Sequence, residues 1–283
     1  MIDVRSLTFK YQKTPVLKGL SFHVEKGEIF GFLGPSGAGK STLQKLLIGL
    51  LPNYGGTATV MGQHCDSLKR SFFTRVGVDF EVPTLYENMT ARENLQFFAS
   101  LYSRPCFEID SLLDRLGLKQ EASMRVAAYS KGMKSRLSFA KAILHNPDLI
   151  FLDEPTDGLD PTNAAHMKDI IKGLATQGKT IVLTTHNMQD ATDLCSRVAF
   201  ITDGQLRAVD HPQAFIMKRG AKTLTYNYRD GEQLMRKSTD LHMLSQDPAF
   251  PYLIENNLIT SMHTDEPTLA DVFTDITGGR LEP

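Results

Sequence analysis

A glycine-rich loop, set between a strand-like run and a helix-like run, is the feature that most restricts how this chain can fold. Residues 34–42 read GPSGAGKST, which fits the spacing G-x-x-x-x-G-K-[ST]. The apolar run Glu28–Leu33 precedes the loop. Apolar side chains at helical spacing follow it, at Leu43, Leu46, Leu47 and Leu50. Strand, loop and helix in this order predict an α/β core.

The loop also has the chemistry of a polyphosphate site. Its glycines let backbone N–H groups point inward, beside the positive end of the following helix. We expect Lys40 to reach the β- and γ-phosphates and the Ser41 hydroxyl to bind Mg²⁺. A glycine-rich turn without a ligand is the alternative, and the strand–helix context disfavours it. The residues expected around the phosphates are Gly34, Pro35, Ser36, Gly37, Ala38, Gly39, Lys40, Ser41 and Thr42.

Two further apolar runs end on polar side chains. Asp153 and Glu154 follow the run Leu149–Leu152, and His186 follows Ile181–Thr185. Runs that are apolar on both faces are typical of parallel strands, whose carboxyl ends share one edge of the sheet. We therefore expect Asp153 to hold Mg²⁺, Glu154 to act as general base, and His186 to contact the γ-phosphate or the attacking water. The alternatives are a solvated acidic pair and a structural histidine.

Helix signals divide the rest of the chain. Thr90-Ala91-Arg92-Glu93 has the form of a capping box. Ser130 opens a helix to His145 and offers a second helix start suited to an anion, although many helices begin with serine. A helix at 163–175 completes a strand–helix–strand alternation. After about residue 215 the alternation fades, and residues 216–283 are predicted to form a small domain with a possible strand at Thr223–Tyr228.

Composition excludes several classes of protein. The 31 Lys and Arg balance 32 Asp and Glu, giving a net charge of -1, so no overall positive field favours nucleic acid. The three cysteines lack metal-ligand spacing, and their scatter is compatible with a reducing compartment. We expect their side chains to be buried in the protein core. The first residues lack a signal-peptide pattern, and the longest apolar runs fall short of a membrane span. We expect a cytoplasmic chain whose membrane role, if any, depends on a partner.

With its motifs in this order, the chain resembles the ATPase subunit of ATP-binding-cassette (ABC) transporters over about residues 1–215. The resemblance implies an α/β P-loop NTPase core with a mainly parallel sheet, an antiparallel β subdomain, a helical subdomain at about 85–146 and a small C-terminal extension. It makes Tyr11 the aromatic that stacks on adenine and His186 the switch histidine. It identifies residues 129–133 (YSKGM), with Ser130 and Gly132, as the signature loop, and Gly158-Leu159-Asp160 as the D-loop.

In that family the signature loop completes the site of a second cassette, and the pair closes around two ATP molecules to drive a membrane subunit. The resemblance therefore implies ATP and Mg²⁺, a second ATPase chain taken to be an identical copy, and an integral membrane permease. It also implies a location on the cytoplasmic face of the cell membrane. The signature loop and the segment Glu266–Phe273 are similar to those of bacterial multidrug and antibiotic exporters. An ordinary amphipathic helix is the alternative for the second segment.

The sequence departs from the family at two places. Glu81 stands where a glutamine usually senses Mg²⁺, and a carboxylate can ligate the metal but repels phosphate. Lys131 and Met133 replace usual signature residues. Neither change removes Glu154, so we predict an active ATPase.

Two other functions fit less well. An importer ATPase differs in the style of its signature loop. A soluble ABC ATPase acting on ribosomes or DNA would need a second cassette in the chain or a long heptad run between the nucleotide motifs, and this sequence has neither.

Overall fold

The glycine-rich loop joins strand β3 (Ile29–Leu33) to helix α1 (Lys40–Leu47) at the centre of a six-stranded sheet. The protein is represented by a computed structural model that describes residues 1–231 and 233–278. The sheet has the order β10-β9-β3-β8-β7-β6, and all neighbouring pairs are parallel except β9 and β10. Its other strands are β6 (Val76–Asp79), β7 (Leu149–Asp153), β8 (Thr180–Thr185), β9 (Arg197–Thr202) and β10 (Gln205–Asp210).

Every residue of β3, β7 and β8 is buried, as expected for strands covered on both faces. The helices that connect or flank these strands are α2 (Arg70–Phe73), α6 (Pro161–Thr176) and α7 (Met188–Leu194). Helix α6 begins at Pro161, and Asp160 caps it by accepting the N–H groups of Thr162 and Asn163.

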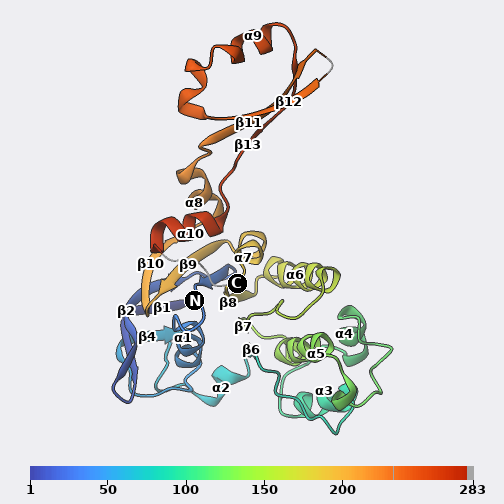
Figure 1. Cartoon of the computed structure of the whole chain (residues 1–283). Coiled ribbons are helices and arrows are strands. Elements are labelled where there is room, and N and C mark those ends of the chain that lie inside the picture. The colour runs from blue at the N-terminus through green and yellow to red at the C-terminus, as the bar shows by residue number, and fades with distance from the viewer. Residues whose placement is uncertain (232, 279–283) are drawn as a thin grey trace. The chain divides into compact units, whose positions relative to one another are not determined.

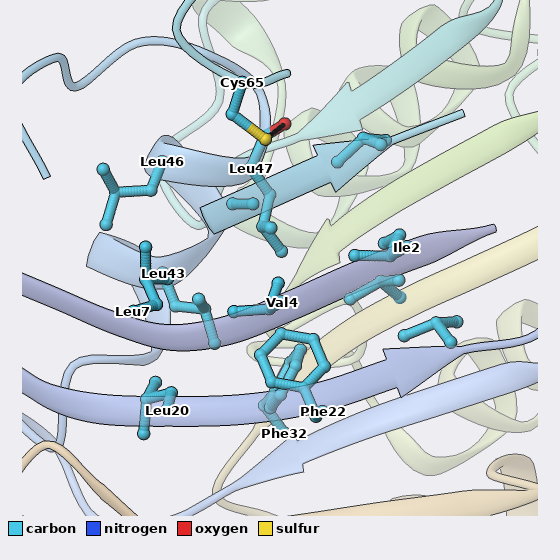
Figure 2. Close-up of a cluster of buried hydrophobic side chains, with 14 of the residues drawn as sticks. Ile2, Val4, Leu7, Leu20, Phe22, Phe32, Leu43, Leu46, Leu47 and Cys65 are labelled. Atoms are coloured by element: carbon cyan, nitrogen blue, oxygen red, sulfur yellow. Dashed lines mark hydrogen bonds between the residues drawn. The ribbon is translucent and has the colours of Figure 1, made fainter. Parts of the chain in front are cut away.

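A second, antiparallel sheet has the order β2-β1-β4-β5. Its strands are β1 (Ile2–Tyr11), β2 (Thr14–Val24), β4 (Gly55–Val60) and β5 (Gln63–His64). Figure 2 shows the core that these strands share with β3 and α1, drawn around Val4, Phe22 and Phe32. Leu43, Leu46 and Leu47 of α1 are fully buried in it, and each such side chain contributes about 1.5–3 kcal/mol. The helix that follows the loop is thus fixed between the two sheets.

Between β6 and β7 the chain forms a group of helices, which Figure 1 shows beside β6 and β7 and away from the antiparallel sheet. The group contains α3 (Ala91–Ser100), α4 (Ile109–Arg115), the 3₁₀ helix η1 (Val126–Ala128) and α5 (Lys131–Ile143). The predicted capping box is confirmed at Thr90 and Glu93, and Ser130 caps α5 by accepting the N–H of Met133. One buried hydrogen bond ties α5 to the sheet: the Ser138 hydroxyl donates to Asp79 at the end of β6, at 2.6 Å.

The described residues divide into two compact units, one over residues 1–212 and one over residues 213–278 apart from residue 232. Helix α8 (Pro212–Arg219) begins at this division. The second unit contains a three-stranded antiparallel sheet of order β12-β11-β13. Its elements are β11 (Thr223–Asp230), β12 (Gln233–Asp240), the 3₁₀ helix η2 (Leu241–Gln246), α9 (Ala249–Glu255), β13 (Ile259–Thr264) and α10 (Leu269–Thr277).

A small core holds the second unit together around Leu224, Tyr226 and Leu253. The hydroxyl of Tyr226, which is fully buried, donates to Asp247 at 2.7 Å, and Lys237 donates to the same carboxylate at 2.7 Å. The strand expected at Thr223–Tyr228 is confirmed as part of β11, and α10 overlaps the segment Glu266–Phe273, for which a helix was the alternative. The stretch between them was expected to be irregular, and the structure corrects this with β12, η2, α9 and β13.

The cysteines differ in exposure. Cys65 and Cys195 are buried as predicted, but Cys106 is only partly buried. Burial raises the pKa of the Cys65 thiol to about 12, so this group is inert at neutral pH.

None of the helices in the described ranges is long and apolar enough to cross a membrane.

Candidate active site

One cleft of about 450 Å³ gathers most of the side chains singled out in the sequence. It lies where the loop after β3, the ends of β7 and β8, the segment after β6 and the end of β1 meet. This is the edge where parallel strands end, as the strand order required. The lining residues are Tyr11, Val16, Ser36, Gly37, Gly39, Lys40, Ser41, Thr42, Glu81, Asp153, Glu154, Asp157 and His186.

The loop conformation depends on its glycines. Gly39 immediately precedes α1 with φ of 103°, a left-handed conformation that glycine adopts without strain. At Gly34 a Cβ atom would collide with the backbone carbonyl of Ile201 in β9. Gly34 and Pro35 do not line the cleft, but their carbonyls accept hydrogen bonds from Lys40 at 2.7 and 3.1 Å. Ala38, which is part of the loop, is buried.

Lys40 is a buried cation facing carboxylates. Only 7% of the residue is exposed, and desolvation lowers the pKa of its ammonium, while Glu154, Asp153 and Glu81 act in the opposite direction. A buried ammonium beside backbone N–H groups attracts an anion more strongly than one in water would.

Asp153 and Glu154 occupy different environments although they are adjacent. Asp153, 7% exposed at the end of β7, accepts a hydrogen bond from the Thr184 hydroxyl of β8. Glu154 has a left-handed backbone with φ of 52° and donates its N–H to the Thr184 carbonyl at 2.9 Å. This turn directs the Glu154 carboxylate toward His186.

His186 holds that carboxylate at two points. Its Nδ1 lies 2.9 Å from Glu154 Oε1, and its backbone N–H donates to Oε2 at 3.3 Å. An ionised carboxylate can only accept hydrogen bonds, so the contact places the imidazole proton on Nδ1. Nε2 is left for another partner.

The remaining predicted residues fall into two groups. Tyr11 and Glu81 are exposed at the cleft, and the ring of Tyr11 packs edge-on against Phe9 with centroids 4.9 Å apart. Ser130 and Gly132 lie at the start of α5 and do not line this cleft. A Cβ atom on Gly132 would approach the Leu159 side chain to 3.3 Å, so the signature loop borders the D-loop instead.

Sequence reasoning missed three residues at the site. Val16 and Asp157 line the cleft, and Thr184 fixes Asp153. Asp157 lies three positions after Glu154 in the same loop, a spacing that could have drawn attention to it. It accepts a hydrogen bond from Lys131 at 2.7 Å. Thr184 pairs with Asp153 through the parallel register of β7 and β8, which local sequence does not encode.

The donor set suits a hard divalent cation. Ser41 offers a hydroxyl oxygen and Asp153 a fixed carboxylate in the same cleft. Mg²⁺ is commonly held by one or two such protein oxygens together with substrate phosphates and water. Among the described residues no group of three or more His, Cys, Asp and Glu side chains is arranged to hold a metal ion.

Sheet order, phosphate loop and paired acids define a P-loop nucleoside triphosphatase of the ATP-binding-cassette type. The chain belongs to the ABC transporter family, and the sequence model of that family matches residues 17–157. A fluoroquinolones export ATP-binding protein of Mycobacterium tuberculosis is 46% identical over 99% of this chain and 94% of that protein. Nod factor export ATP-binding protein I of Burkholderia thailandensis is 40% identical over 76% of this chain and 72% of its own length.

Solved structures agree with this assignment. An ATP-binding subunit of an ABC transporter superposes with a TM-score of 0.71 at 28% identity, over 78% of this chain and 93% of that chain. A dimeric ATP-binding cassette bound to ADP and Pi, in a post-hydrolysis state, superposes with a TM-score of 0.66 at 25% identity. The superposition covers 75% of this chain and 98% of that chain. The family and fold class predicted from the sequence are confirmed, and the chain is an ATP-binding ATPase subunit.

Proposed function

We propose that this chain hydrolyses ATP to drive an exporter, working on the cytoplasmic face of the cell membrane with an integral membrane permease. The observation that carries the proposal is the Glu154 carboxylate, oriented by His186 in the cleft that contains the phosphate loop. Export is supported by relatives over most of the chain that are named export ATP-binding proteins.

Each side chain of the cleft has a distinct task in this proposal. The loop N–H groups and Lys40 bind the phosphates, and Tyr11 stacks on the adenine. Ser41, Asp153 and Glu81 hold Mg²⁺, which neutralises phosphate charge when bound. Glu154 accepts a proton from the attacking water, since its carboxylate is held in place and lies beside the phosphate loop. His186 keeps that carboxylate aligned and offers Nε2 to the γ-phosphate.

A second copy of the chain completes the site. Ser130 and Gly132 stand at the start of α5, outside the cleft of their own chain. A helix start with free N–H groups is an anion site, and a head-to-tail partner would bring these residues to the γ-phosphate. The solved relative that is titled as dimeric supports this arrangement.

The exported substrate is proposed to be a drug of the fluoroquinolone type. The support is the fluoroquinolones export relative, which matches 99% of this chain. The proposal can be tested with inverted membrane vesicles that contain the complex. ATP and a fluoroquinolone are added outside, and ATP-dependent uptake of the drug is followed by its own fluorescence.

The decisive experiment combines ATPase assays with purification of the complex. Glu154→Gln keeps the size of the side chain and removes the base, so kcat should fall about 10²- to 10⁴-fold while ATP still binds. Glu87→Gln, at an exposed carboxylate outside the cleft, serves as the control. A stoichiometric membrane protein should co-purify in detergent. Wild-type turnover in Glu154→Gln, or recovery without a membrane partner, would contradict the proposal.

A further inference from the structure

A partly buried polar cluster lies near the Glu154–His186 pair and does not line the cleft that contains the phosphate loop. The Thr156 hydroxyl donates to the Asp190 carboxylate, and the Lys168 ammonium lies 3.1 Å from Asp190 and 2.6 Å from Asp193. The side chain of Asp190 is 9% exposed. Lys168 and Thr156 supply the polar partners that a buried acidic side chain needs.

The cluster joins the two segments that carry the catalytic pair. Thr156 lies two residues after Glu154, in the loop between β7 and α6. Asp190 lies four residues after His186, on α7. Thr156 and Asp190 also line, together with Glu154 and His186, a second hollow of about 260 Å³. The Thr156–Asp190 contact thus joins the two segments beside the hollow that the pair also lines.

Both segments are internally stiff, so a constraint at the cluster reaches the pair. Asn187 caps α7 by accepting the N–H groups of Gln189 and Asp190. In the loop, Asp157 donates its N–H to the Glu154 carbonyl at 3.1 Å. Few torsions remain free between Thr156 and Glu154, or between Asp190 and His186.

Lys168 contacts both acidic residues of α7. The hydrogen bond to Asp193 raises the pKa of Lys168, and contacts with Asp190 act in the same direction. Lys168 is on α6, so the cluster joins three elements: the loop after β7, α6 and α7.

We propose that Asp190 is a positioning residue for ATP hydrolysis, which fixes the distance between Glu154 and His186 by holding Thr156 against α7. The inference rests on the catalytic roles proposed for Glu154 and His186. Asp190 itself does not touch the nucleotide, so its loss should change kcat and leave ATP binding intact. A displacement of about 1 Å in a reacting group can cost on the order of 10²-fold in rate.

The test uses the full chain, purified as its complex, with kcat and KM for ATP measured for each variant. Asp190→Ala removes the acceptor of the Thr156 hydroxyl, Thr156→Val loses only the hydroxyl, and Thr156→Ser restores it. Asp193→Ala is the matched control, because Asp193 pairs with Lys168 and the Thr156 hydroxyl donates to Asp190 instead. Melting curves confirm that each variant is folded.

We expect Asp190→Ala and Thr156→Val to lower kcat by about tenfold or more with KM changed less than about twofold. Thr156→Ser and Asp193→Ala should stay near wild type. The double variant Asp190→Ala/Thr156→Val should be no worse than either single, because both remove the same contact.

Two results would overturn the positioning role: wild-type kcat in both Asp190→Ala and Thr156→Val, or a Thr156→Ser variant as slow as Thr156→Val. Should Asp190→Ala fail to fold, the pair of Thr156 variants decides the question. Glu154→Gln is measured in parallel. Its turnover tests the proposed function itself, so a failure of that proposal is distinguishable from a failure of this one.

Discussion

Asp79 carries the clearest pH-dependent prediction. It is 5% exposed at the end of β6 and accepts a hydrogen bond from Ser138 of α5. Burial raises the pKa of its carboxyl from 3.8 to about 7, while the Ser138 hydrogen bond and the charge of Lys141 act in the opposite direction. The folded protein therefore holds a proton here that the unfolded chain releases near pH 4. Asp79→Asn removes the titration and keeps an oxygen that can accept from Ser138.

The direction and size of the pH effect on the free energy of unfolding follow from the difference in proton binding between the folded and unfolded states. Because the folded state binds the proton more tightly, stability falls as pH rises from about 4 to about 7 and then levels. At about 1.4 kcal/mol per unit, a pKa of about 7 costs the wild-type protein on the order of 4 kcal/mol at high pH. Asp79→Asn should avoid this cost. Its free energy of unfolding should exceed that of the wild-type protein by about 2 kcal/mol near pH 5 and by about 4 kcal/mol near pH 8.

Hydrogen exchange gives the stability of the first unit separately from that of the second. Amides of β6 and α5 in wild type and Asp79→Asn would be followed at several pH values, with Asp114→Asn as the control. Asp114 is an exposed carboxylate, 3.4 Å from Lys119, so its replacement should leave the pH dependence unchanged. An Asp79→Asn advantage that does not vary with pH would refute the argument. So would a variant less stable than wild type near pH 8.

Two other predictions concern single contacts. Gly34→Ala places a methyl group against the Ile201 carbonyl, so the loop must shift and ATP affinity should drop at least about tenfold. Equilibrium binding of a fluorescent ATP analogue measures the affinity. An unchanged affinity would contradict the prediction, because it would mean that the loop backbone shifts at little energetic cost. Tyr226→Phe leaves Asp247 with Lys237 and removes one buried hydrogen bond. It should destabilise the second unit by about 1 kcal/mol in hydrogen exchange without altering ATPase activity; a loss of ATPase activity would contradict that separation.

The first unit was predictable because its signals are local and strict. The loop from Gly34 to Thr42 has one spacing and one context, and it fixes the strand before it and the helix after it. The runs Leu149–Leu152 and Ile181–Leu183 are apolar throughout, as expected for strands of a parallel sheet covered on both faces. The rule that parallel strands end at one edge then predicts that Lys40, Glu154 and His186 meet. Their catalytic roles stay predictions.

The second unit was harder to predict because its strands bury little. Most of β12 is exposed, with Arg236 and Lys237 in succession, so no alternation of apolar and polar residues marks it as a strand. Its pairing with β11 supplies what the local pattern lacks. The contacts that orient the site are also remote in sequence: Ser138 and Asp79 are 59 residues apart, and Thr156 and Asp190 are 34 apart.

The left-handed backbone at Glu154 shows where this fold favours activity over stability. A residue other than glycine in that conformation costs about 1–3 kcal/mol, and here the residue is a charged one facing other carboxylates. Glycine would remove the strain and the neighbouring charge together, so a protein optimised for heat resistance alone would not retain glutamate at this turn. Engineered thermostable forms of this chain should draw their gains from other positions, because glycine here would remove the side chain proposed as the general base.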